Sequence, residues 1–312
     1  MTNVGVDDIF LKRFIKTQLK EDPTKVIYKR INAGHRANSY IFRLYTNKRY
    51  VIQFYDEKSL HQPIKRCYIY TLTKNYTFVP VPKVFFIGKF EKYSYIILEK
   101  LNGKTVDKIK KTDIKYVLEK LGEYLYDIHN NVNVGKKFGW IEGKFINFQG
   151  ISNIEYLNNE IIRIKNWLVA INRIKEAKSI ADYFCLRIKK LKLDVQPVLV
   201  WSEINKKNLL FNNIKGEKIV YLLDPGSAKV APREIDILAA EQEFNNNEFK
   251  YILKGYLKNG KNKILKQNLS IYRDYMMADF YAYKMSLNEN KDKEYKKAES
   301  YLINNNIIKK IL

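Results

Sequence analysis

Cysteine and histidine are scarce in this chain of 312 residues, which has two of the first and three of the second. The two cysteines, Cys67 and Cys185, lie far apart and in unrelated sequence contexts. A structural zinc site needs about four closely spaced Cys or His ligands, so this composition excludes a zinc-cluster protein. We expect two buried thiols in the reduced state instead.

Long hydrophobic runs are also missing. No segment approaches the roughly 20 apolar residues of a membrane-spanning helix. The nearest candidate, residues 78–88, is interrupted by Pro80 and Pro82. The first 14 residues contain two aspartates and lack the apolar centre of a secretory signal. Hydrophobic residues still make up 46% of the chain, which is enough for a sizeable core. We therefore expect a soluble, cytoplasmic protein with no membrane partner.

Negative charge is in short supply. The chain has 57 Lys and Arg against 33 Asp and Glu, a net charge of +24. Such an excess suggests nucleic acid or another anionic partner. However, the lysines are spread along the whole chain, so we favour a solvated basic surface over a dedicated nucleic-acid site. The charge favours nucleotide phosphates and disfavours a polycationic substrate, unless local carboxylates reverse the field.

Runs rich in β-branched and aromatic residues predict a sheet in the first hundred residues. Periodic apolar residues predict a helix over 7–20, and a second helix is expected over 57–74. The expected strands cover residues 27–31, 39–45, 49–55, 84–89 and 93–98. This part of the chain is therefore expected to form an antiparallel sheet with one inserted helix.

The remaining residues are mainly helical in pattern. Helices are predicted over 111–130, 154–175 and 177–191, and over most of the chain after residue 236. A short buried strand is expected at 196–201, and a hairpin at 208–211 and 218–223 that turns around Asn212 and Asn213. These patterns predict an α+β protein of two lobes, with an N-lobe over 1–98, a hinge over 99–103 and a C-lobe over 104–312.

Polar side chains follow the short strands of the predicted C-lobe. Asn208 and Asp224 offer two oxygen ligands from neighbouring hairpin strands, which suits Mg²⁺ because this ion takes few protein ligands and keeps water and phosphate oxygens. Glu203, five residues before Asn208, stands where a carboxylate could orient or deprotonate a hydroxyl. Such a set is what phosphoryl transfer requires.

This region resembles the aminoglycoside phosphotransferase, choline kinase and fructosamine kinase superfamily, which has a protein-kinase-like fold. Those enzymes carry a loop of the form H-x-D-x-x-x-x-N, a strand that ends in Asp, and a second Asp before a helix. Residues 201–208 (WSEINKKN) stand at the loop, residues 223–226 (LDPG) at the strand, and residues 233–236 (REID) at the second Asp. The resemblance implies that Glu203, Asn208 and Asp224 are catalytic and that Asn208 and Asp224 hold the metal.

The resemblance extends through the N-lobe in the same order. Residues 32–40 (NAGHRANSY) are similar to the glycine-containing phosphate loop, and residues 93–103 (YSYIILEKLNG) to the strand and hinge that bind adenine. The resemblance therefore implies ATP or GTP with Mg²⁺ as cofactors. The nucleotide-binding residues that it implies are Gly34, Asn38, Ser39, Gln53, Glu99, Lys100 and Leu101.

Several positions depart from the family pattern. Glu203 replaces the catalytic Asp, Trp201 replaces the loop His, and Gln53 stands where Lys or Arg is usual. The helix glutamate that would pair with that lysine is not evident, since Lys65 and Arg66 occupy the matching stretch. Losing both members of an ion pair is self-consistent, because no lone buried charge is then expected to remain.

Other polar residues have simpler interpretations. We expect Asp236 to brace the catalytic loop through hydrogen bonds rather than to touch substrate. His129 ends a helix that is similar to one in the family, and it is most simply a surface or packing residue. Trp201 is most simply a core aromatic residue on a strand.

Together these features favour an ATP- and Mg²⁺-dependent kinase that phosphorylates a hydroxyl of an amino sugar, sugar or amino alcohol. The acceptor pocket is expected among residues 154–191 and 240–290. The altered positions leave open an alternative, a pseudokinase that keeps the fold as a binding or regulatory module. A third hypothesis is a nucleic-acid binder that uses the basic charge. The acceptor's identity, the choice of ATP or GTP and the oligomeric state stay open.

Overall fold

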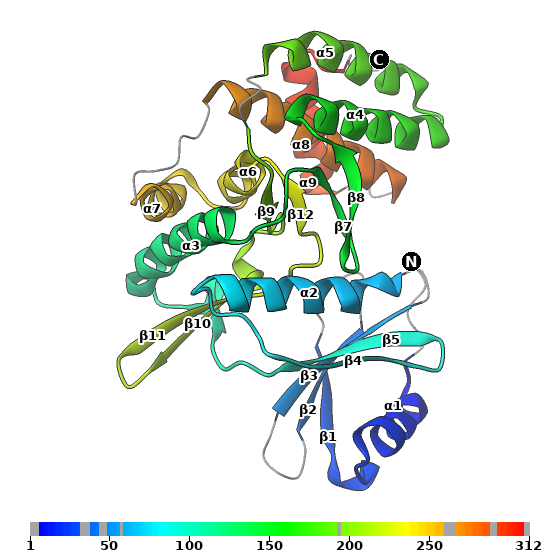
Figure 1. Cartoon of the computed structure of the whole chain (residues 1–312), viewed down its shortest axis with the longest axis vertical. Helices are drawn as coiled ribbons and strands as arrows, with labels where there is room; N and C mark the ends of the chain where they lie inside the picture. The colour runs from blue at the N-terminus through cyan, green and yellow to red at the C-terminus, as the bar shows by residue number, and fades with distance from the viewer. Residues whose placement is uncertain are drawn as a thin grey trace.

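The structure is a computed structural model, and it describes residues 6–31, 38–43, 49–56, 59–191, 195–258, 266–287 and 292–308. It has two lobes, an N-terminal one built on a sheet and a C-terminal one that is mainly helical (Figure 1). The predicted fold class is therefore confirmed. The residue limits assigned to the lobes and the hinge remain predictions.

The N-lobe sheet has five antiparallel strands in the order β1-β2-β3-β5-β4. Its strands are β1 (Ile27–Ile31), β2 (Asn38–Arg43), β3 (Arg49–Tyr55), β4 (Val84–Phe90) and β5 (Tyr93–Glu99). Alternate residues of a strand face opposite sides of a sheet. Accordingly, Phe54 packs toward helix α1 (Asp8–Phe14), whereas Tyr55 packs toward helix α2 (His61–Tyr76).

Seven helices form most of the described part of the C-lobe. They are α3 (Lys111–Asn131), α4 (Asn153–Ala170), α5 (Ile174–Arg187), α6 (Glu234–Glu243), α7 (Asn246–Leu257), α8 (Lys266–Ser286) and α9 (Lys293–Asn304). Helices α3 and α7 cross at close range, because a side chain at Gly122 or Gly255 would overlap the backbone of the other helix. This close crossing fixes the end of α3 against the strands that carry the site.

Two small sheets complete the C-lobe. One has the order β11-β10-β6, and the other has the order β8-β7-β12-β9. Their strands are β6 (Lys104–Thr105), β7 (Phe138–Glu142), β8 (Phe145–Gly150), β9 (Val198–Val200), β10 (Leu209–Ile214), β11 (Glu217–Leu222) and β12 (Lys229–Ala231). The sequence predicted β9, β10 and β11, but it did not reveal β6, β7, β8 or β12.

The turn of the β10–β11 hairpin differs from the prediction. Asn212 and Asn213 lie within β10 and pair with β11, so they are not the turn residues. The chain reverses at Lys215 and Gly216, whose φ angles are 53° and 91°. Positive φ at both central residues matches the twist of a tight hairpin, and glycine accepts it without strain. The longer strands extend the hairpin beyond the site.

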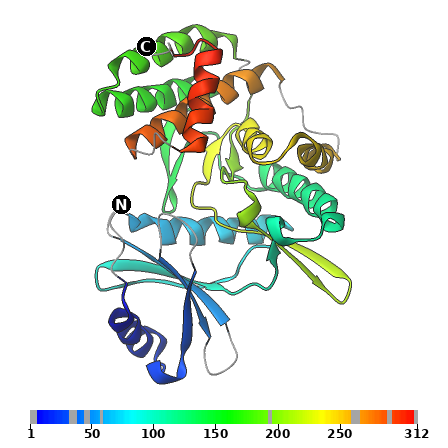
Figure 2. The same cartoon turned by 180° about the vertical axis from the view of Figure 1, so that it is seen from behind.

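The cores connect the two lobes through α2. Tyr70 of α2 belongs to the same buried cluster as Leu121 of α3 and Leu222 of β11. A second cluster lies between α1 and the N-lobe sheet, and a third lies among α4, α5, α8 and α9. In both cartoon views α2 lies between the sheet and the C-lobe (Figures 1 and 2). A residue on α2 can therefore reach the catalytic segments.

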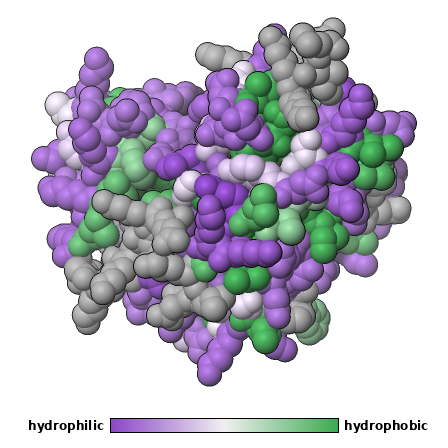
Figure 3. Space-filling view, turned by 90° about the horizontal axis from the view of Figure 1, so that it is seen from above, coloured by the Kyte–Doolittle hydropathy of each residue, from purple (hydrophilic) through white to green (hydrophobic). Residues whose placement is uncertain are grey.

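The surface agrees with the composition. On the face shown in Figure 3, hydrophilic residues predominate and hydrophobic residues gather in separate small groups. No helix in the described ranges is both long enough and apolar enough to cross a membrane. Both cysteines are free, but the expectation that both are buried was wrong: Cys67 is half-buried and Cys185 is exposed.

Candidate active site

The predicted catalytic loop, residues 201–208, follows β9 and is braced by Asp236. The carboxylate of Asp236 is fully buried at the start of α6 and accepts the backbone N–H groups of Trp201 (2.8 Å) and Ser202 (2.6 Å). Hydrogen bonds to an ionised acceptor are among the stronger ones in proteins. The structure thus confirms the expected bracing role of Asp236.

Two further side chains complete this support. His129 is buried, with Nε2 at 3.1 Å from Asp236 Oδ2 and Nδ1 at 2.9 Å from the Tyr256 hydroxyl. An ionised carboxylate only accepts, so Nε2 donates to Asp236 and Nδ1 accepts from Tyr256. His129 is therefore more than a surface or packing residue. Trp201 is fully buried, as expected, and its Nε1 also donates to the Leu223 carbonyl (2.9 Å).

Backbone strain is concentrated next to the candidate catalytic residues. Ser202, directly before Glu203, has φ of 67°, and Asp224 has φ of 56°. Residues other than glycine rarely adopt the left-handed region, and the cost is of order 1–3 kcal/mol when they do. The hydrogen bonds to Asp236 stabilise the first of these conformations. Strain of this kind is common where a loop must present a side chain in a fixed direction.

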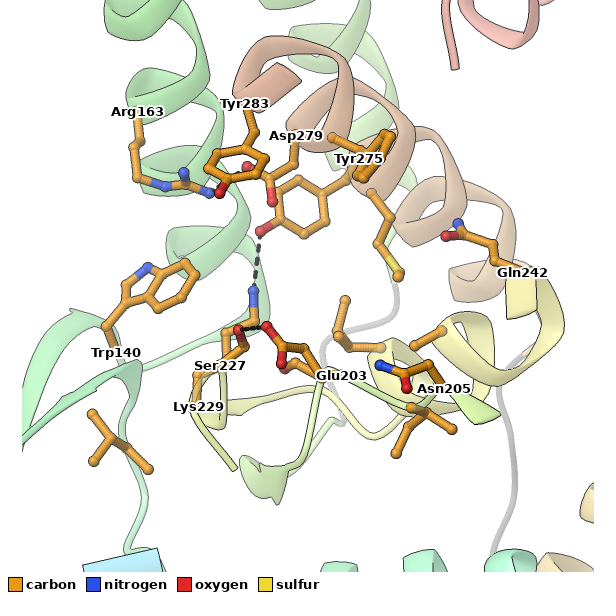
Figure 4. Close-up of a pocket in the computed structure, with 18 of the residues that line it drawn as sticks. Trp140, Arg163, Glu203, Asn205, Ser227, Lys229, Gln242, Tyr275, Asp279 and Tyr283 are labelled. Atoms are coloured by element: carbon orange, nitrogen blue, oxygen red, sulfur yellow. Dashed lines mark hydrogen bonds and ion pairs between the residues drawn. The ribbon is translucent and has the colours of Figure 1, made fainter. Parts of the chain in front are cut away.

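Glu203 lines a cavity of about 810 Å³ whose wall comes from the C-lobe and from His61, Gln62 and Lys65 of α2. Its Oε1 accepts a hydrogen bond from the Ser227 hydroxyl, and its backbone carbonyl accepts one from Asn208 Nδ2 (3.1 Å). Figure 4 shows the Glu203 carboxylate beside Ser227 in this cavity. Among the described members of the predicted site set, only Glu203 lines the cavity. It is thus positioned to meet a ligand bound there.

Asn208 and Asp224 are neighbours, as the hairpin predicted. The backbone N–H of Leu223 donates to the carbonyl of Asn208 (2.8 Å), which places the residue after Leu223 beside Asn208. The Asn208 amide nitrogen is directed at the Glu203 carbonyl, so its oxygen is turned toward the opposite side. The Asn208 backbone therefore lies beside the strand end that carries Asp224.

Asp224 forms an ion pair with Arg66 of α2. The guanidinium Nη1 contacts Asp224 Oδ1, which also accepts the backbone N–H of Gly226 at 3.2 Å. Arg66 is 7% exposed, so its charge is buried, but it is paired with Asp224 and is not the lone buried charge that was expected to be absent. Burial by itself lowers the pKa of Arg66, but attraction by Tyr55 and Asp224 outweighs it and raises the net pKa, so the guanidinium is charged.

The N-lobe residues of the predicted site are only partly in the described ranges. Gly34 lies outside them, and so does the side chain of Asn38, although Asn38 itself begins β2. Gln53 of β3 donates to the Ser39 hydroxyl (3.3 Å) and accepts from the Tyr55 hydroxyl (2.9 Å). Gln53 is therefore fixed in the sheet by neutral hydrogen bonds rather than by a charged partner.

The predicted hinge follows β5. The N–H of Glu99 donates to the Lys83 carbonyl (2.9 Å), and the N–H of Lys100 donates to the Arg49 carbonyl (3.3 Å). The Lys100 ammonium contacts the Leu101 carbonyl at 2.5 Å. These bonds hold the hinge backbone against β3 and β4. The hinge residues do not line the cavity that contains Glu203.

The structure adds a set of cavity residues that the sequence did not single out. Aromatic side chains form much of the wall around Glu203, and Figure 4 shows Trp140, Tyr275 and Tyr283 at the cavity. The aromatic residues of the wall are Trp140, Trp167, Tyr275, Phe280 and Tyr283. The cavity lies among α4, α8 and the β7–β8 hairpin, which agrees in part with the expected location over 154–191 and 240–290.

A buried charged cluster forms the wall of the cavity next to Glu203. Glu160 is fully buried and accepts from Trp140 Nε1 (2.8 Å), the Tyr275 hydroxyl (2.5 Å) and Arg163 Nη2 (2.7 Å). Burial by itself would raise the pKa of Glu160, but Lys229 and Arg163 outweigh burial and lower it. Glu160 is therefore ionised and organises both aromatic rings.

Lys229 of β12 projects into the same cavity and is 5% exposed. Its Nζ lies 3.3 Å from the Tyr275 hydroxyl and 4.4 Å from the centre of the Trp140 ring. None of the ion pairs formed among the described residues includes Lys229. Burial lowers its pKa, although the charge of Glu160 opposes this effect.

A signal for part of this set was present in the sequence. Lys229 is the only charged residue in the segment 225–232 (PGSAKVAP), directly after the expected metal aspartate. A single lysine in a short apolar segment indicates either a surface strand or a functional charge. Glu160 and Arg163 gave no comparable signal, because they belong to an ordinary amphipathic helix pattern.

No family model matches the chain, and no curated protein matches it in sequence. Solved structures do match its fold. A thermostable mutant of the aminoglycoside phosphotransferase APH(4)-Ia has a TM-score of 0.71 at 16% identity, over 95% of this chain and 98% of that one. A candidate fructosamine-3-kinase from Haemophilus somnus has a TM-score of 0.69 at 15% identity, over 95% and 96%. The protein thus shares the fold of these phosphotransferases, as its motifs predicted.

Proposed function

We propose that the protein is a nucleotide-dependent phosphotransferase that acts on a hydroxyl group of a small molecule. The observation that carries this proposal is the position of Glu203. It lies on a strained loop braced by Asp236, between the Asn208–Asp224 pair and a cavity large enough for a sugar-sized ligand. This arrangement brings a carboxylate to the boundary between a phosphate side and an acceptor side.

In the proposed reaction the acceptor hydroxyl lies in the cavity against Glu203. Its oxygen would attack the γ-phosphorus, the bond to the bridging oxygen would break, and the nucleoside diphosphate would leave. Glu203 would accept the hydroxyl proton, while Ser227 holds the carboxylate in place through Oε1. Glutamate is one methylene longer than aspartate, so the acceptor would be seated slightly farther from the loop.

The nucleotide would bind between the lobes. We propose adenine or guanine at Glu99, Lys100 and Leu101, and phosphates near the loop that begins β2, with Gly34, Asn38, Ser39 and Gln53. Two solved structures of the same fold support this part. One contains ADP with hygromycin B, and another contains GDP with kanamycin.

Magnesium held by Asn208 and Asp224 stays a prediction, and the residues as they lie do not fit a resident ion. An amide oxygen such as Asn208 Oδ1 is a suitable ligand for Mg²⁺. However, Asp224 Oδ1 already contacts a guanidinium, whose charge would repel a divalent cation. The proposed reaction therefore contains no step that depends on a metal ion.

The acceptor cavity combines aromatic faces with charges of both signs. Its lining includes four basic side chains, Lys65, Arg163, Lys229 and Lys297, and four acidic ones, Glu142, Glu203, Glu243 and Asp279. A sugar ring can pack on an aromatic face while its hydroxyls bind the charged groups. A polycation would meet the buried ammonium of Lys229, so the cavity supports a sugar or amino alcohol of low charge.

The test is to replace Glu203 by Gln and to measure nucleotide turnover with a panel of sugars, amino sugars and amino alcohols. Wild-type protein should turn over nucleotide with at least one class of acceptor. Glu203→Gln should lower that rate at least about a hundredfold, the usual contribution of a general base, without weakening nucleotide binding. The matched control is Glu217→Gln on the exposed end of the hairpin, which should keep the wild-type rate.

Nucleotide binding without turnover by the wild type, over the whole panel, would contradict the proposal and favour the pseudokinase alternative. An unchanged rate in Glu203→Gln would leave a transferase but remove Glu203 from its mechanism.

A further inference from the structure

Arg66 comes from the helix that separates the lobes, and it reaches the strand end where a metal was expected. Its guanidinium is buried against the Asp224 carboxylate, whose side chain is 33% exposed. The exposed side of the pair is therefore Asp224, and the cation lies behind it. The positive charge at this position belongs to the protein itself.

The surroundings are shaped for the guanidinium. A side chain at residue 226 would overlap the Arg66 guanidinium, so Gly226 leaves the space that the group occupies. The guanidinium carbon lies 5.6 Å from the centre of the Tyr55 ring, a favourable position for a cation over an aromatic face. The Tyr70 hydroxyl accepts the N–H of Asp224 (3.0 Å) and fixes the backbone at the pair.

One donor of Arg66 is buried and unpaired. Its buried Nε has no hydrogen-bond partner in the described structure. A buried N–H without a partner is costly, and an added oxygen acceptor removes the cost. The Arg66 guanidinium thus has a partner for its charge, but its Nε–H group lacks an acceptor.

The same site cannot readily hold a divalent cation as well. The single charge of Asp224 is matched by that of Arg66, and a Mg²⁺ ion bound to the same carboxylate would lie next to a second cation. Among the described residues, no group of three or more Asp, Glu, His or Cys side chains is placed to hold a metal. No second cluster of carboxylates in that part of the chain would therefore take over the role of Asp224.

We propose that Arg66 replaces the divalent cation on the phosphate side, so that the protein binds a free nucleoside triphosphate, without Mg²⁺. This inference rests on the proposed function, because it concerns the same nucleotide site. The positive charge that offsets the Asp224 carboxylate is carried by α2 rather than by an ion, and Gln53 adds no further charge.

The test measures ATP binding by calorimetry in a buffer with EDTA and in a buffer with MgCl₂. The wild type should bind ATP in EDTA with a Kd within about threefold of the value with magnesium, a difference of less than 1 kcal/mol. A Kd that is measurable only with magnesium would overturn the inference and leave the proposed function intact. No binding of ATP or GTP in either buffer would overturn both.

Substitution of Arg66 sharpens the test. Arg66→Gln should weaken metal-free binding at least about tenfold, and magnesium should restore binding because the substitution releases Asp224. Arg66→Lys keeps the charge and should retain metal-free binding if Arg66→Gln is poorly folded. Unchanged metal-free binding in Arg66→Gln would contradict the inference. The control is Arg13→Gln, which removes an exposed arginine paired with Glu91 on the far side of the sheet and should bind ATP as the wild type does.

Discussion

Two buried cations, one paired with Asp224 and one in the cavity that Glu203 lines, are stabilised differently. Arg66 contacts a carboxylate directly and fits a space left by Gly226. Lys229 contacts a tyrosine hydroxyl and an aromatic face, but it forms no ion pair with a described carboxylate. The charge of Arg66 is compensated within the protein by Asp224, whereas the charge of Lys229 is compensated only in part.

The difference lies in how the nearest carboxylate is used. Asp224 accepts a contact from Arg66 directly. Glu160 is the carboxylate whose charge acts most strongly on Lys229, but its oxygens accept hydrogen bonds from Trp140, Tyr275 and Arg163. Burying an ion is costly unless a direct partner repays the cost. The pair at Asp224 is thus largely complete without a ligand, whereas on the acceptor side an oxygen of the proposed acceptor would complete the partners of Lys229.

The largest effect is expected when the acceptor-side cluster loses its only fully buried acid. Glu160→Gln should destabilise the protein by about 3–5 kcal/mol, because Lys229 loses the carboxylate that acts most strongly on it, Arg163 keeps only its pair with Asp279, and the new amide faces N–H and O–H donors. Urea unfolding measures the loss as a lower midpoint at unchanged slope.

The control for Glu160→Gln is the exposed substitution Glu217→Gln, which should change stability by less than about 0.5 kcal/mol. A loss below about 1 kcal/mol for Glu160→Gln would mean that the cluster is hydrated rather than buried. The contrast with the Arg66–Asp224 pair would then disappear.

A smaller effect is expected on the phosphate side from Gly226→Ala. The added methyl group would overlap the Arg66 guanidinium, and overpacking of this kind costs about 1–3 kcal/mol. The same substitution in an Arg66→Gln background should cost less, because glutamine is shorter and leaves the space open. Urea unfolding of both pairs gives the coupling energy. An equal cost in the two backgrounds would show that Gly226 is not shaped to Arg66.

Much of the fold could be predicted because its elements are local patterns. The strands around Gln53 and the amphipathic helix that ends near His129 have a clear period of two or 3.6 residues. The loop residues Glu203, Asn208 and Asp224 could be placed together because they follow short strands in the right order. The short strand that carries Lys229 was not recognised, because three residues are too few for a periodic signal.

The two cations themselves could not be predicted in their roles. Arg66 follows Lys65 in a helix, and such a basic pair usually indicates a solvated face, yet both side chains are buried. Their burial depends on how α2 packs between the lobes, which is a tertiary contact. Likewise, Lys229 meets Trp140 and Tyr275 only after segments that are distant in the sequence pack together. Local sequence patterns do not predict such tertiary contacts.

The smallest effect, and the sharpest for the comparison, concerns Lys229→Met. Burial holds the folded-state pKa of Lys229 below its ordinary value of 10.5. Between the two pKa values the unfolded chain binds more protons than the folded one, so wild-type stability should rise with pH relative to the variant in that window. At lower pH both states are protonated, and the difference in stability should be constant, with the variant within about 1 kcal/mol of the wild type or more stable.

Urea unfolding at about pH 7.5, 9 and 10 measures the trend. The exposed substitution Lys296→Met should give a flat difference. A flat difference for Lys229→Met as well would mean that Lys229 is as well matched as Arg66, because a full partner would remove the penalty that burial imposes on its charge.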